Sequence, residues 1–186
     1  MIPGLTASGV LPPFVGSAPT DPAGCSPYRV ELSDLYAAFA NSPERQRLLL
    51  GLLDYREALR LAGVVDGFQL IDGSFTEDCE ALRQRPPSDI DVVTFARLPV
   101  PPDQKAAFGE ANAGLFATRL TKPTYHCDAY FVDLDLPGHL LVEDTAYWFG
   151  LFSHQRVTSL WKGLVQVQLA SNDADVRAAL NAQGGS

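Results

Sequence analysis

Residues 68–95 decide the fold of this chain, and they read FQLIDGSFTEDCEALRQRPPSDIDVVTF. The apolar run at 68–71 is typical of a buried strand, and it leads through Asp72 into Gly73-Ser74. A polar connection rich in charged residues follows. Residues 90–95 are rich in β-branched side chains and predict a second strand, with Asp89 and Asp91 at its start. We therefore expect two core strands, the first followed by Gly-Ser and the second opened by Asp-x-Asp.

Helix patterns flank these two strands. Ser42 is a good N-cap, and Leu48, Leu52 and Leu59 recur on one helix face, which predicts a helix that ends near Gly63. Further helices are expected at 33–40, 104–113, 140–149 and 172–180, and further strands at 127–134 and 164–169. The alternation of helices and strands predicts an α/β or α+β fold.

Length and composition predict one globular domain behind an irregular arm. The chain has 186 residues, of which 46% are hydrophobic and 19% charged, as in ordinary globular proteins. Residues 1–32 are expected to form a Pro/Gly-rich N-terminal arm, and residues 33–186 a single domain. The net charge of −8 argues against an open basic groove for long duplex nucleic acid, because phosphate contacts dominate such binding.

The sequence also indicates the cellular compartment and whether the chain meets a membrane. No apolar run approaches the roughly 20 residues that cross a bilayer, and no basic segment followed by an apolar one opens the chain. We therefore expect no membrane partner. The cysteines Cys25, Cys79 and Cys127 are odd in number and lack zinc-finger spacing, which favours a reduced, cytoplasmic setting.

Asp89 and Asp91 are the strongest candidates for chemistry. Residues two apart in a strand point to the same face, so their carboxylates are expected to lie side by side and to repel unless a cation separates them. Mg²⁺ takes carboxylate oxygens and completes its shell with phosphates and water. Gly73 allows close approach of the backbone to a phosphate, and Ser74 adds a hydroxyl. Taken singly, each pattern also fits an ordinary turn or the solvated start of a strand.

A third acid is expected on the strand at 127–134. Asp128 shares its face with Tyr130, whereas Asp133 and Asp135 have the opposite parity, and the pattern alone leaves both sets open. Three carboxylates that hold two metal ions would activate a nucleophile and neutralise charge on a leaving pyrophosphate.

Together the motifs resemble those of the DNA polymerase β-like nucleotidyltransferase superfamily. The resemblance extends over residues 44–135 and rests on Gly73-Ser74, Asp89-Ile90-Asp91-Val92-Val93 and Cys127-Asp128-Ala129-Tyr130-Phe131. It implies a minimal palm, with a mixed sheet flanked by helices and the active site at the strand ends. It also implies that Gly73 and Ser74 bind the nucleotide, while Asp89, Asp91 and Asp128 are catalytic and hold Mg²⁺ or Mn²⁺.

The activity that the resemblance implies is transfer of a nucleotidyl group from an NTP or dNTP. The acceptor would be a nucleic-acid end, a protein or a small molecule. Analogy with small stand-alone proteins of this type suggests a toxin–antitoxin or phage-defence setting, with a protein partner from the same operon. The alternative is a catalytically inactive member of the superfamily that binds a partner protein through the arm and the aromatic segment at 147–152.

Several basic residues are candidate phosphate ligands, but each is more typical of packing or of a solvated surface. They are Arg83, Arg85, His126, His154, Arg156 and Lys162.

Overall fold

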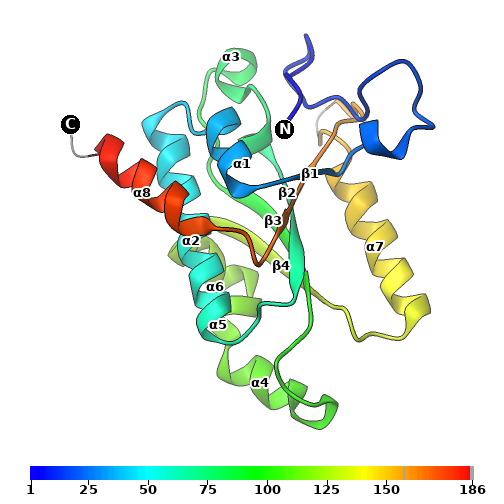
Figure 1. Ribbon diagram of the computed structural model, residues 1–186, viewed down its shortest axis with the longest axis vertical. Coiled ribbons are helices and arrows are strands. Elements are labelled where there is room, and N and C mark those ends of the chain that lie inside the picture. The colour runs from blue at the N-terminus through cyan, green and yellow to red at the C-terminus, as the bar shows by residue number, and fades with distance from the viewer. Residues whose placement is uncertain (157, 185–186) are drawn as a thin grey trace.

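The sheet is the centre of the molecule in the computed structural model, which describes residues 1–156 and 158–184 (Figure 1). Its five strands have the order β1-β5-β2-β3-β4. Strand β2 is antiparallel to both of its neighbours, whereas β3 pairs with β4, and β1 with β5, in parallel. The strands are β1 Tyr28–Val30, β2 Gly67–Asp72, β3 Ile90–Ala96, β4 Cys127–Asp133 and β5 Val165–Gln168. The mixed sheet flanked by helices confirms the predicted α+β class.

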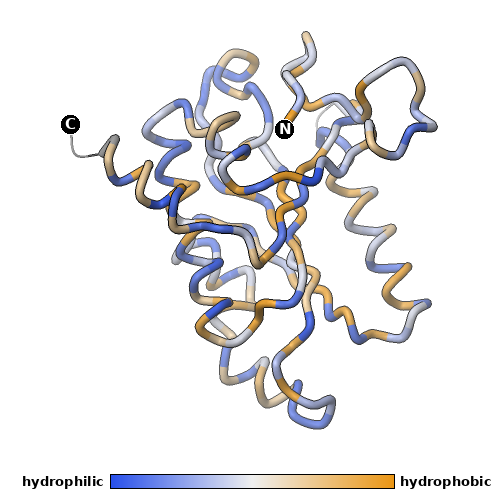
Figure 2. The backbone as a smooth tube through the Cα atoms, in the orientation of Figure 1, coloured by the Kyte–Doolittle hydropathy of each residue, from blue (hydrophilic) through white to orange (hydrophobic). Residues whose placement is uncertain are grey.

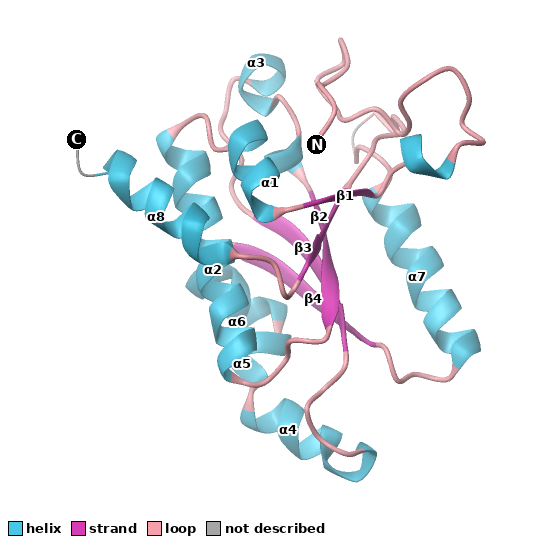
Figure 3. Cartoon of the chain, in the orientation of Figure 1, coloured by secondary structure: helices cyan, strands magenta, loops and turns pink. Residues whose placement is uncertain are grey.

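Helices lie on both sides of this sheet, with most of them on one face (Figure 3). Among the described α-helices, α7 lies on the other side, near the N-terminal segment. The helices are α1 Leu32–Phe39, α2 Pro43–Leu61, α3 Cys79–Arg83, α4 Lys105–Ala111, α5 Ala113–Phe116, α6 Thr118–Tyr125, α7 Gly138–Phe152 and α8 Asp173–Gly184. No helix in the described ranges is both long enough and apolar enough to span a bilayer.

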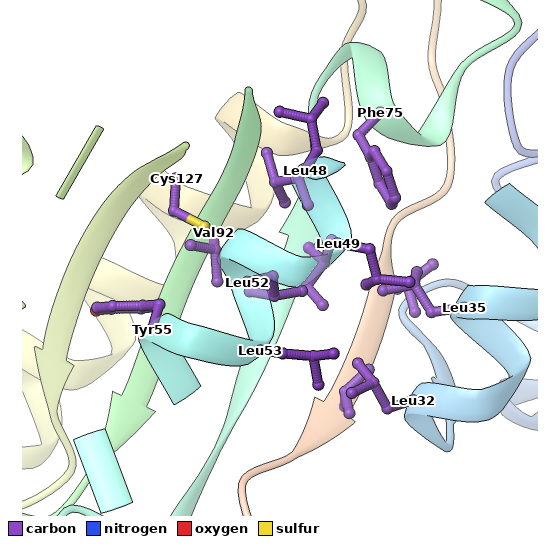
Figure 4. Close-up of a cluster of buried hydrophobic side chains, with 14 of the residues drawn as sticks. Leu32, Leu35, Leu48, Leu49, Leu52, Leu53, Tyr55, Phe75, Val92 and Cys127 are labelled. Carbon is purple, nitrogen blue, oxygen red and sulfur yellow. The ribbon is translucent and has the colours of Figure 1, made fainter. Parts of the chain in front are cut away.

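The main hydrophobic core lies between the sheet and α2 (Figure 4). Helix α2 begins as predicted, because the Ser42 side chain accepts a hydrogen bond from the Arg45 amide. Leu48, Leu49 and Leu52 of α2 are completely buried in the same core as Val92 of β3, whereas Leu61 at the end of the helix is exposed. Burial of each such side chain stabilises the fold by about 1.5–3 kcal/mol, so this face of the sheet is firmly packed.

The opposite face of the sheet is covered less completely. Leu70, Val93 and Val132 form a smaller cluster there, to which α7 contributes Phe152 as its buried residue. Apolar and polar positions alternate along α7, whereas the strands are predominantly apolar (Figure 2). Because alternate strand residues face opposite sides, the even-numbered residues of β2 and β4 and the odd-numbered ones of β3 belong to this second face.

The N-terminal segment packs against the domain and contributes a strand to its sheet. Val10 and Leu11 are buried, and the Leu11 carbonyl accepts a hydrogen bond from the Gly163 amide at 2.8 Å. The sequence analysis predicted no strand at Tyr28–Val30, which form β1 within the segment 1–32 that was assigned to the N-terminal arm. A three-residue strand is too short to show a period, and its partner β5 lies far along the chain.

Helix α6 was also missing from the sequence-based prediction. It contains Pro123, a residue that lacks the amide hydrogen of a regular helix and normally ends one. Contacts with α2 and β4 hold α6 in place nevertheless. The helix ends at His126, which has a left-handed backbone (φ 57°) and leads directly into β4. This connection brings the last turn of α6 to the start of β4.

Candidate active site

The strand register aligns three aspartates across the sheet. Asp91 on β3 is opposite Asp72 on β2 and opposite Asp128 on β4. Neighbouring strands lie about 4.8 Å apart, and all three positions belong to the face that α7 covers. The predicted pair of Asp91 and Asp128 is therefore brought together, and Asp72 extends the row on the other side.

The register also decides which acid of β4 joins Asp91. Asp133 is opposite Ala96 at the far end of β3. There its carboxylate pairs with Lys105, with an Nζ–Oδ2 distance of 2.6 Å. Asp128 is thus the third acid of the row, and the alternative that the sequence left open is settled by strand pairing.

Asp89 joins the row through a lysine of α6. The Lys122 ammonium lies 2.5 Å from Asp89 Oδ2 and 3.5 Å from Asp128 Oδ2. The Lys122 side chain is 51% exposed, whereas those of Asp89 and Asp128 are 13% and 20% exposed. The two carboxylates therefore share one cation that solvent still reaches. We call Asp72, Asp89, Asp91 and Asp128 the acid row.

Burial and mutual repulsion shape the electrostatics of the acid row. Burial raises the pKa of Asp91 to about 6, with further contributions from the carboxylates of Asp89 and Asp128. Lys162 and Lys122 act in the opposite direction without cancelling these effects. The ionised form of Asp91 is thus short of compensating positive charge, and an added cation would stabilise it.

Gly73 lies against the acid row. Its backbone has φ 84° and ψ −164°, a conformation that is almost restricted to glycine. A Cβ at this position would overlap Asp91 Oδ2 and lie 2.9 Å from Asp91 Cγ. The turn that begins with Ser74 (Ser74–Thr76) follows immediately. Gly73 therefore borders the acid row at Asp91, and Ser74 opens the turn that follows it.

A buried charge cluster lies beneath the Gly-Ser turn. Lys162 Nζ is 3.0 Å from Asp72 Oδ2 and 2.7 Å from Glu77 Oε1, and all three side chains are at most 6% exposed. Glu77 also pairs with Arg83 at 2.5 Å and accepts a hydrogen bond from Gln155 at 3.0 Å. Lys162 therefore joins residues on the two sides of the turn.

These partners shift the pKa values in opposite senses. Burial raises the pKa of Asp72 to about 6, although the charge of Lys162 opposes it. Burial also acts to raise the pKa of Glu77, but the charge and hydrogen bond of Lys162, the hydrogen bond of Gln155 and the charge of Arg83 together outweigh it, and the pKa is lowered. The lysine is protonated, because the two acids more than offset its loss of hydration and raise its pKa.

The turn is fastened to α2 by a second buried cation. Arg45 donates to the carbonyl oxygens of Phe75 and Glu77, each at 2.6 Å, and to both carboxylate oxygens of Glu80 at 2.7 Å. The Arg45 side chain is 3% exposed. Because α2 is firmly packed in the main core, these bonds give the Gly-Ser turn a rigid support.

Sequence reasoning missed several of these residues. Asp72, Glu77 and Lys122 were not proposed for the site, and Lys162 was assigned to packing or to the surface. Of the other basic residues considered, Arg83 joins the buried cluster, whereas His126 ends α6. The one available signal was the position of Asp72 directly before Gly-Ser; the lysines come from distant segments and show no motif.

The donor set of the acid row fits a hard cation. All of its ligands are carboxylates, which Mg²⁺ and Mn²⁺ accept. Within residues 1–156 and 158–184, no three Asp, Glu, His or Cys side chains are grouped closely enough to coordinate one ion together. The ammonium of Lys122 instead occupies the position between Asp89 and Asp128. Carboxylate chemistry therefore suits a divalent ion, but the described side chains of the row would have to close further around such an ion than they do here.

Comparison with known proteins places the chain in a family. The sequence profile of one family matches residues 3–168, which include all five strands, the Gly-Ser turn and the acid row. The chain belongs to the Family of unknown function (DUF6932). The DUF6932 match ends before α8. No curated protein and no solved structure matches the chain.

Proposed function

We propose that this DUF6932 protein is a metal-dependent nucleotidyltransferase of the DNA polymerase β-like type. It would transfer a nucleotidyl group from an NTP or dNTP to a nucleic-acid end, a protein or a small molecule. The observation that carries the proposal is the register of Asp91 and Asp128 on β3 and β4, with the glycine of the Gly-Ser turn packed against Asp91.

Each part of the site has a role in this proposal. Asp89, Asp91 and Asp128 hold Mg²⁺ or Mn²⁺, and the ion supplies charge neutralisation at the triphosphate and activation of the attacking hydroxyl. Gly73 lets the backbone approach the phosphates, and the Ser74 hydroxyl donates a hydrogen bond to them. The buried cluster around Lys162 keeps the turn in place, because it pairs with acids on both sides of Gly73-Ser74.

The proposal extends to the cellular setting. Free thiols at Cys25, Cys79 and Cys127 are compatible with a reducing, cytoplasmic compartment. By analogy with small stand-alone nucleotidyltransferases, the setting would be toxin–antitoxin or phage defence, with a protein partner encoded in the same operon.

The decisive experiment is a transfer assay. The protein is incubated with each labelled NTP, with Mg²⁺ or Mn²⁺ and with protein and RNA acceptors, and the products are analysed by mass spectrometry. Asp89→Asn and Asp91→Asn should abolish transfer, because Asn keeps the shape of Asp but loses the charge that binds the metal. Asp135→Asn is the matched control, since Asp135 lies beyond the far end of β4 and pairs with Lys105. It should retain activity.

Stability separates a catalytic from a structural role for the two acids. Removal of one of several neighbouring like charges relieves repulsion, so Asp91→Asn should lower the free energy of unfolding by no more than about 1 kcal/mol. Full transfer activity in Asp91→Asn would contradict the proposed site. A loss of several kcal/mol would instead make Asp91 a structural residue.

A second candidate function is a catalytically inactive, partner-binding protein. The observation that favours it is Lys122, which already neutralises Asp89 and Asp128. Helix α7 exposes Val142, Tyr147 and Leu151 at 68%, 61% and 52%, and together with the N-terminal segment it would form the interface. A wild-type protein that binds Mg²⁺–NTP but transfers nothing to any acceptor would support this function over the first.

A further inference from the structure

The ammonium of Lys122 lies between two carboxylates of the acid row, where a cation is favoured by their negative charge. It lies in the last turn of α6, where its carbonyl oxygen accepts a hydrogen bond from the His126 amide. That short connection into β4 places its ammonium beside the first acid of the strand, Asp128, and within 2.5 Å of Asp89 Oδ2. One ammonium thus bridges two of the three proposed metal ligands.

The exposure of Lys122 allows its ammonium to move away from the two carboxylates into solvent. Its side chain is 51% exposed, and the long lysine stem lets the ammonium move into water without a change in the backbone. Lys162, the other lysine near the acid row, is 3% exposed and is enclosed by Asp72 and Glu77. Of these two lysines, Lys122 is the exchangeable one.

We propose that Lys122 is an internal counter-ion of the acid row, which keeps Asp89 and Asp128 charge-balanced until a divalent cation displaces it. The inference rests on the proposed function for the identity of that cation. A bound ammonium and a bound metal exclude each other, because both need the same carboxylate oxygens. Metal binding therefore carries the cost of breaking two ion pairs, and Lys122 lowers the affinity of the site for metal.

The chain contains a matched control at the other end of the same strand. Lys105 Nζ lies 2.6 Å from Asp133 Oδ2 and 2.9 Å from Asp135 Oδ2, so it too bridges two aspartates. Its removal changes the net charge by the same amount as removal of Lys122. It does not touch the acid row.

The experiment is a Mn²⁺ titration, in which free Mn²⁺ is followed by electron paramagnetic resonance. Four proteins are compared: wild type, Lys122→Gln, Lys122→Arg and Lys105→Gln. Lys122→Gln should bind Mn²⁺ at least about tenfold more tightly than wild type, a difference equivalent to about 1.4 kcal/mol. Lys122→Arg, which keeps the cation, and Lys105→Gln should stay within about twofold of wild type.

A second measurement uses the wild-type protein alone and covers the case in which Lys122→Gln fails to fold. Amine acetylation is followed residue by residue by mass spectrometry, with and without Mn²⁺. Mn²⁺ should accelerate acetylation of Lys122 and leave that of Lys105 unchanged, because the displaced ammonium enters water. An unchanged rate at Lys122 under saturating Mn²⁺ would overturn the inference.

The outcomes separate the inference from the proposed function. If wild type binds Mn²⁺ and Lys122→Gln binds it no more tightly, Lys122 is not the counter-ion that metal displaces, whereas the proposed metal site stands. If Lys122→Gln binds more tightly but wild type transfers no nucleotide, the inference holds and the activity fails. If no protein of the four binds Mn²⁺ at millimolar concentration, both are wrong.

Discussion

Gly73→Ala tests whether the Gly-Ser turn and Asp91 form one site. The substitution adds a single methyl group where the backbone has φ 84° and ψ −164°. The new carbon would overlap Asp91 Oδ2 and approach Asp91 Cγ to 2.9 Å. Either the turn changes conformation or the Asp91 side chain leaves its rotamer, and both changes open the gap between the turn and the acid row.

The expected magnitude follows from these two effects. A residue other than glycine in this region of backbone conformation costs about 1–3 kcal/mol. Displacement of the Asp91 side chain from its rotamer adds about 0.5–1.5 kcal/mol. Because Arg45 of α2 donates hydrogen bonds to the carbonyl oxygens of Phe75 in the turn and of Glu77 at its end, the turn cannot relax freely. We therefore expect Gly73→Ala to lower the free energy of unfolding by about 2–4 kcal/mol.

Urea unfolding followed by circular dichroism measures this loss, and Mn²⁺ titration of the folded variant measures the damage to the site. Gly16→Ala is the control, since Gly16 also has a positive φ of 89° but no atom within 4 Å of an added Cβ. Only the backbone strain remains at Gly16, so we expect a loss of about 1–2 kcal/mol. A Gly73→Ala protein as stable as Gly16→Ala, with unchanged Mn²⁺ affinity, would refute the reasoning.

Three more perturbations probe the charges around the site. Lys162→Met leaves the buried Asp72 carboxylate without its cation and Glu77 with Arg83 alone. It should lower the free energy of unfolding in urea by about 3–5 kcal/mol, whereas Lys105→Met, at a more exposed pair, should lower it by about 1 kcal/mol or less. The hydrogen bond from Arg45 lowers the pKa of Glu80 to about 2 from its ordinary 4.5. The ionised Glu80 carboxylate therefore stabilises the folded state above pH 4.5, and this stabilisation is lost as the pH falls towards 2. Wild type should therefore lose stability more steeply than Glu80→Gln between these pH values, and parallel curves would contradict this. Mg²⁺ with a nucleoside triphosphate should raise the temperature midpoint of unfolding, because a ligand at 100 times its Kd stabilises the native state by about 2.7 kcal/mol. Equal shifts of the midpoint with and without Mg²⁺ would indicate a metal-independent site.

The elements that were predicted correctly owe their form to local chemistry. Ser42 and the leucine spacing of α2 specify a helix wherever the segment packs, and the β-branched run of β3 favours an extended chain. The face on which Asp91 lies likewise follows from the period of β3, whereas Asp89 precedes that strand. Such features depend on neighbours within a few residues, and the sequence displays them directly.

The sequence by itself therefore determined the α+β class and the Gly-Ser turn that follows β2. Only the tertiary structure decided that Asp128 rather than Asp133 joins Asp91, because the choice depends on the pairing of β3 with β4. It also decided the positions of Lys122 and Lys162, which reach the acid row from α6 and from the segment before β5. Ion pairs between distant segments form only when packing has fixed the backbone, and no local pattern in the chain encodes them.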